Sequence, residues 1–87
     1  MYLSISDEER ARAVHYVVEN VPKETLLQIY EEIAKEPDWL ILQHFGIGTE
    51  IRNLLRKGGF AWDDTNLDRE WEPITLEATH RVYGEVR

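Results

Sequence analysis

The sequence contains no cysteine, and it contains no serine after Ser6. The lack of cysteine excludes disulfide bonds and thiolate metal sites, and it fits a reducing compartment. Threonine and tyrosine are the hydroxyl nucleophiles that remain for most of the chain, and no histidine–acid pairing is identifiable around them. General acid–base work would fall to abundant carboxylates such as Asp63, Asp64 or Glu77, so a non-enzymatic role is favoured over catalysis.

Long apolar runs are missing as well. No stretch approaches the roughly 20 apolar residues that a membrane span needs. The start of the chain has no basic segment followed by an apolar one, which is the pattern of a signal peptide. We therefore predict a cytoplasmic protein with no membrane partner.

Positive charge is scarce, and the net charge is −7. Residues 1–36 and 58–87 each carry −4, whereas residues 37–57 carry +1. Nucleic-acid binding depends on clustered Lys and Arg that neutralise phosphates, so we expect no nucleic-acid partner. A helix-turn-helix domain that binds DNA is a third possibility. It is disfavoured, because the helix that contacts DNA would carry only Arg52, Arg56 and Lys57 in an otherwise acidic chain.

With 87 residues, the chain is long enough for one core and too short to divide. Three Trp, four Tyr and two Phe supply a large apolar area per residue, which helps a small domain to build a core without disulfide bonds. We predict a single helical domain over residues 1–87.

Two amphipathic helices are predicted first. Ser6 and Glu9 have the spacing of a capping box, so a helix begins at about residue 7. Pro22 ends this helix and suits the first position of a second one, which runs to about Lys35. The short link predicts a helical hairpin over residues 7–35.

Residues 39–42, Trp-Leu-Ile-Leu, form a segment that is apolar on every side. Pro37-Asp38 before it predicts a stop followed by a helix cap. Such a segment is either buried all round or placed at an interface.

Gly46 and Gly48 follow, and they allow positive φ or a close approach of backbones. Thr49 is predicted to cap the next helix, at about residues 50–57. We interpret residues 46–48 as a glycine corner between helices.

The last helix has two predicted starts, since either Asp68 or Glu72 can cap it, in the second case with Pro73 at its preferred first position. We favour a helical turn near Asp68 that becomes regular helix at Pro73 and ends at Gly84. The whole pattern predicts an all-α fold: a compact bundle of four or five short helices, with a helical hairpin at the N-terminus and the glycine corner at residues 46–48.

The glycine corner is also a weak candidate for an anion site. Gly46, Gly48 and Thr49 offer free backbone N–H groups at a helix start, with the Arg52 guanidinium nearby. The Lys and the preceding strand of a phosphate-binding loop are absent, which favours an architectural corner between packed helices.

A second candidate combines Arg52 and Asn53 with His44 and the acidic pair Asp63-Asp64. The fixed donors of a guanidinium suit bidentate binding of carboxylates. This group is either a structural tie or a polar recognition patch for a partner.

Two pairs have a spacing found in helical metal sites, His15 with Glu19 and Glu77 with His80. A di-metal bundle needs further inward carboxylates at matching depth. We therefore predict no metal and no cofactor.

The run His44-Phe45-Gly46-Ile47-Gly48-Thr49-Glu50-Ile51-Arg52-Asn53 resembles a signature of small bacterial domains of unknown function. In that family, His-Phe-Gly-x-Gly-x-x-Ile-Arg-Asn precedes a polar loop and a final helix that ends near a His-Arg pair and a Gly. The matching end in this chain is His80-Arg81-Val82-Tyr83-Gly84. The resemblance implies a short, helical, stand-alone protein and brings no activity with it.

We therefore expect a small acidic protein-interaction module that self-associates or binds a protein partner. The alternative is a small-anion or nucleotide-ligand binding domain centred on residues 46–49 and Arg52. In either case the residues expected to bind are His44, Gly46, Gly48, Thr49, Arg52, Asn53, Asp63 and Asp64.

Overall fold

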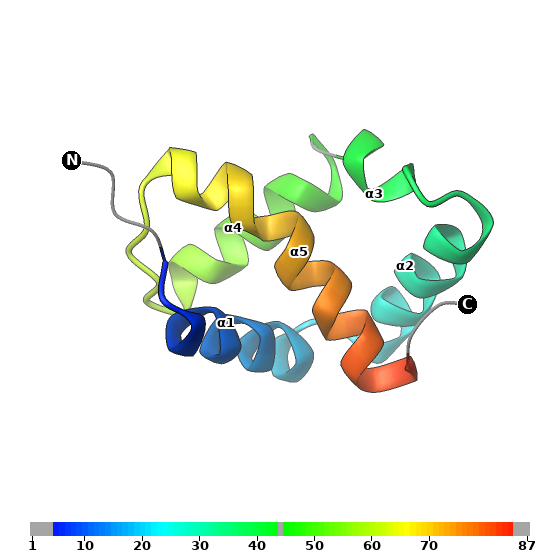
Figure 1. Ribbon diagram of the computed structural model, residues 1–87, viewed down its shortest axis with the longest axis horizontal. Helices are drawn as coiled ribbons and strands as arrows, with labels where there is room; N and C mark the ends of the chain where they lie inside the picture. The colour runs from blue at the N-terminus through cyan, green and yellow to red at the C-terminus, as the bar shows by residue number, and fades with distance from the viewer. Residues whose placement is uncertain (1–4, 44, 85–87) are drawn as a thin grey trace.

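The structure is a computed structural model that describes residues 5–43 and 45–84. Within these residues it contains five helices and no strand (Figure 1). The helices are α1 (Asp7–Asn20), α2 (Lys23–Lys35), α3 (Trp39–Leu42), α4 (Ile47–Lys57) and α5 (Asp64–Tyr83). The predicted all-α bundle is confirmed.

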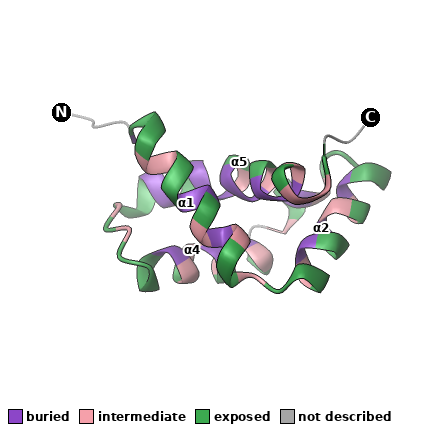
Figure 2. Cartoon of the chain, turned by 90° about the horizontal axis from the view of Figure 1, so that it is seen from below, coloured by how far each residue is buried: buried purple, intermediate pink, exposed green. Residues whose placement is uncertain are grey.

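Helix α5 is the element on which the others assemble. It packs against α1, α2 and α4, while α1 also meets α4 and α3 meets α2. Figure 2 shows the buried residues gathered where the long helices face one another. The short link predicted between the first two helices is present at residues 21–22, but the predicted packing of α1 against α2 as a hairpin is wrong. Within the described residues the two helices have no extensive contact with each other, because each packs mainly on α5.

The start of α1 follows the predicted capping pattern. The Ser6 hydroxyl accepts a hydrogen bond from the backbone N–H of Glu9 at 3.1 Å. Asp7, Glu8 and Glu9 occupy the first turn, where the helix dipole favours negative charge. Helix α2 begins at Lys23, so Pro22 is its N-cap and not its first residue.

Helix α4 begins at Ile47, three residues before the predicted start, and Gly46 is its N-cap. The prediction that Thr49 caps this helix is therefore wrong. Thr49 lies inside the first turn, where its hydroxyl donates to the Phe45 carbonyl at 3.2 Å. Neither Gly46 nor Gly48 has a positive φ. Gly48 lies inside α4, where the lack of a side chain serves close packing.

Gly48 is buried against Trp71 of α5. A Cβ atom built at Gly48 would lie 2.9 Å from Cζ2 of Trp71 and 3.1 Å from Nη1 of Arg52. Real Cβ atoms do not approach other atoms so closely, so the missing side chain is what allows α4 and α5 to pack at this distance.

Helix α5 starts at Asp64, earlier than either predicted start at Asp68 or Glu72. Its N-cap is Asp63, whose carboxylate accepts from the backbone N–H of Asn66 at 2.8 Å. Pro73 lies inside the helix and removes one backbone donor without ending it. The extension beyond both predicted starts follows from tertiary packing, because the added turn buries Asn66 and Leu67.

Arg10 connects α1 to α5 through a nearly buried carboxylate. Its Nε and Nη2 donate to the two oxygens of Glu70 at 2.8 and 3.0 Å. These hydrogen bonds raise the pKa of Arg10 above its usual value, so the guanidinium stays charged wherever the protein is folded. One residue earlier, Glu9 accepts from the indole N–H of Trp62, which ties the 58–63 loop to the same end of α1.

The Gly48–Trp71 contact predicts the effect of a single methyl group. We expect Gly48→Ala to lower the free energy of unfolding by about 1–2 kcal/mol, because the overpacking exceeds the gain in helix propensity. Asn53→Ala is the control, since residue 53 is exposed on the same helix, where alanine gains propensity without a clash and removes only a solvent-exposed hydrogen bond from Arg56. Urea unfolding of the two variants measures the difference. A Gly48→Ala protein as stable as the original would show that the contact is not tight.

Candidate functional site

The predicted binding residues divide between the start of α4 and the start of α5. Gly46 caps α4, and Gly48 and Thr49 occupy its first turn. His44 lies outside the described residues, so its predicted role is not placed. Asp63 is the N-cap of α5, and its carboxylate accepts a hydrogen bond from the backbone N–H of Asn66. This carboxylate is therefore already engaged in the helix start.

The Arg52 side chain is only 11% exposed, and it contacts one residue of α4 and one of α5. Its Nη2 donates to the Thr49 hydroxyl at 3.2 Å, and its Nε lies 3.5 Å from Oδ1 of Asp68. Arg52 therefore contacts a carboxylate, as predicted. The carboxylate belongs to Asp68, so the predicted partners Asp63 and Asp64 are wrong.

Arg56, one turn later, takes the partner that was predicted for Arg52. Its Nη2 donates to Oδ1 of Asp64 at 2.7 Å, and its Nη1 donates to Oδ1 of Asn53 at 3.0 Å. The shift has one cause. Because α5 begins at residue 64, its first two turns run beside α4 and place Asp68 near Arg52.

Two grooves lie away from these residues. One has a volume of about 300 Å³ and lies between the α1–α2 link, α2 and α4. The other, about 610 Å³ and more open, runs along α1 beside Gly58 and Phe60. Neither groove is lined by Gly46, Gly48, Thr49 or Arg52.

Among the residues that the structure describes, the most exposed large apolar side chains lie at the α3–α4 connection. Ile41 is 55% exposed, Leu42 73% and Phe45 89%. We call these three residues the apolar corner. Leu40 on the same short helix is buried, so α3 uses one side for the core and presents the other to solvent.

The apolar corner was missed among the predicted binding residues, although the sequence carried a signal for it. Residues 39–42 are apolar on every side, and a four-residue helix cannot bury all of its faces against one neighbour. The acidic residues Glu36 and Asp38 are exposed just before the corner. The corner is therefore an apolar surface with an acidic edge.

Neither predicted metal pair gathers further ligands. His15 Nε2 lies 3.7 Å from Oε1 of Glu19, and Glu77 pairs with Arg81 at 4.0 Å. Over residues 5–43 and 45–84, no group of three or more His, Asp or Glu side chains is placed to hold a metal ion. In the same described ranges, no helix combines the length and apolarity needed to cross a bilayer.

Comparison with family models, curated proteins and solved structures found no match to this chain. The resemblance of residues 44–53 to the bacterial signature therefore stays a prediction.

Arg52 and Arg56 offer a matched test of structural and exposed ion pairs. We expect Arg52→Ala to lower the free energy of unfolding by about 1–3 kcal/mol, since it removes packed stem atoms and the hydrogen bond to Thr49. Arg56→Ala should cost less than about 1 kcal/mol, because its pair with Asp64 is exposed to solvent. Chemical denaturation of both variants measures the costs. Equal costs would contradict a structural role specific to Arg52.

Proposed function

We propose that the protein is a non-enzymatic protein-interaction module and that the apolar corner is its contact surface. The observation that carries this proposal is the exposure of Ile41, Leu42 and Phe45 within a span of five residues. Single exposed apolar residues are ordinary on protein surfaces, whereas a cluster of large ones is typical of an interaction site. A phenyl ring in such a cluster is a suitable anchor for a partner's pocket.

The charge around the corner favours a basic partner over a second copy of this chain. Lys35, Glu36 and Asp38 are exposed just before the corner, and although residues 37–57 carry +1, the chain as a whole carries −7. Two copies in contact would bring like charges together, which opposes association, whereas a partner with Lys or Arg around an apolar patch would be attracted. The proposed partner is therefore a protein surface or helix with an apolar centre and a basic rim.

A small-anion or nucleotide ligand at residues 46–49 is the weaker proposal. Its guanidinium, Arg52, already contacts Thr49 and Asp68 and is mostly buried. An anion would have to compete with the Asp68 carboxylate for this group.

A basic amphipathic peptide with Leu and Phe on one face and Lys on the other tests the interaction proposal. We expect it to bind the protein, with affinity that falls at higher salt, because apolar burial and charge attraction act together. Phe45→Asp and Leu42→Asp should each weaken binding by at least about tenfold, equivalent to about 1.4 kcal/mol. Isothermal titration calorimetry measures the affinities.

Leu27→Asp is the matched control, since Leu27 is an exposed leucine on α2, outside the corner. It should leave the affinity within about twofold of the original, a difference of about 0.4 kcal/mol. A peptide of the same composition without an apolar face should bind much more weakly. Equal losses in the control and corner variants would count against the corner as the contact surface. Light scattering at increasing concentration should give a monomer mass, and a dimer abolished by Phe45→Asp would make a second copy the partner.

A further inference from the structure

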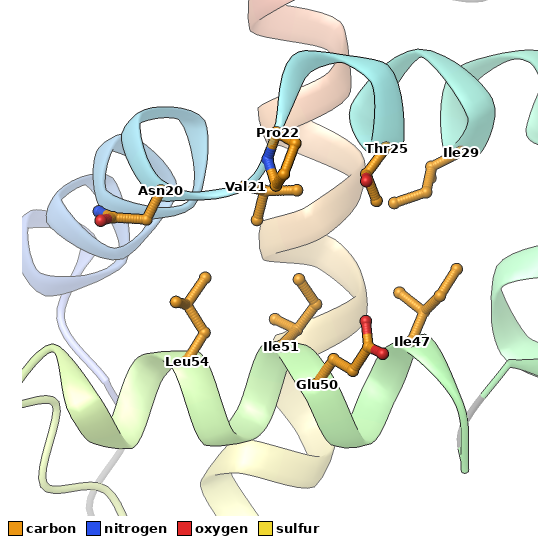
Figure 3. Close-up of a pocket in the computed structure, with 9 residues that line it drawn as sticks. All are labelled: Asn20, Val21, Pro22, Thr25, Ile29, Ile47, Glu50, Ile51 and Leu54. Atoms are coloured by element: carbon orange, nitrogen blue, oxygen red, sulfur yellow. The ribbon is translucent and has the colours of Figure 1, made fainter.

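We propose that the smaller groove is a binding site for small organic cations, namely a primary ammonium group on a short aliphatic or arylalkyl chain. The groove is bounded by the α1–α2 link, α2 and α4 (Figure 3). This site is separate from the apolar corner and does not depend on the interaction proposed for it.

The walls of the groove are mainly apolar. Ile51 and Leu54 point from α4 toward the α1–α2 link, and Val21 points back toward them, while Ile47 points toward Ile29 of α2 (Figure 3). With a volume of about 300 Å³, the groove is at the small end of ligand pockets.

One carboxylate lies among these apolar side chains. Glu50 is on the same face of α4 as Ile47 and Ile51, and its carboxylate projects between them into the groove (Figure 3). Across residues 5–43 and 45–84, no side chain forms an ion pair or hydrogen bond with it. Glu50 lines the groove and is also exposed to solvent, and a carboxylate accepts hydrogen bonds only, so the groove presents an available acceptor to a cationic donor.

The other polar side chains in the lining add a hydroxyl and no charge. Thr25 stands on the α2 wall, opposite α4 (Figure 3). Asn20 is already used, because its Nδ2 donates to the Tyr16 carbonyl at 2.8 Å. None of the residues that line the groove is Lys or Arg, so a bound ammonium meets attraction without a competing cation, and an anion meets repulsion.

The position of Glu50 is not explained by packing. Residues 47, 50, 51 and 54 have the spacing of one helix face, and the other three are apolar. The helix dipole favours an acid in the first turn of α4, but residue 49 would satisfy it without placing a charge in the groove.

Three ligands of similar size and different charge test the proposal: hexylamine, hexanol and hexanoate at pH 7 and low salt. Titration followed by amide chemical shifts should show saturable changes in residues 20–29 and 47–54 with hexylamine. Its affinity should exceed that of hexanol and hexanoate by at least about fivefold, or about 1 kcal/mol. Equal binding of all three, changes confined to other residues, or no saturable change with hexylamine would overturn the proposal.

Three variants identify the groove and the carboxylate. Glu50→Gln should weaken hexylamine by about fivefold or more and leave hexanol unchanged, whereas Glu31→Gln, the same change of charge outside the groove, should leave both unchanged. Thr25→Phe should fill the groove and weaken all three ligands. Circular dichroism verifies that each variant is folded, and the Glu50→Gln comparison decides the question if Thr25→Phe does not fold. Hexylamine binding unaffected by Glu50→Gln would also overturn the proposal.

Discussion

The structure depends on one helix that must be covered by three others. Helix α5 carries buried residues along its whole length, from Asn66 to Thr79, and α1, α2 and α4 each pack against it. A helix surrounded in this way normally has apolar residues on every side, yet Glu70, Thr75 and Thr79 are buried in α5. Each of them has a partner. Arg10 binds Glu70, and the two threonine hydroxyls donate to the carbonyls of Trp71 and Leu76 at 2.6 and 2.7 Å. These bonds allow polar side chains to remain in the interior at little cost.

The sequence favoured an architectural glycine corner over an anion site, and Gly48 serves packing, although it does so from inside α4 and not from a turn. Gly48 lets α4 approach Trp71, and the same approach brings Arg52 to Asp68. The central part of the signature, from Gly46 to Arg52, therefore describes how α4 docks on α5. A residue pattern that is unusual enough to resemble a ligand-binding motif can arise from packing alone, since close contact between helices also demands glycine at a fixed place.

The sequence predicts some local features, with the Thr49 cap as an exception, and it predicts the contacts between helices poorly. The Ser6 cap and the Gly84 stop depend on residues within one turn, so they were predictable, and both are present. The start of α5 could not be predicted in this way. Asp63, Asp68 and Glu72 can each cap a helix, and the burial of Leu67 in the folded protein favours Asp63. The partner of Arg52 depends on that start, so the error carried over to the predicted Asp63-Asp64 contact. The exposure of Ile41 and Leu42 was open in the sequence, which allowed either burial or an interface.

The two surfaces proposed for binding follow from the same geometry. Because α2 and α4 pack mainly on α5 and not on each other, a groove remains between them, with Glu50 on its α4 side. Within the described residues α3 has extensive contacts with α2 and with no other helix, and Ile41 and Leu42 are left exposed. In a chain of 87 residues, one central helix uses most of the apolar surface that the others can offer, and what is left over is available to ligands and partners.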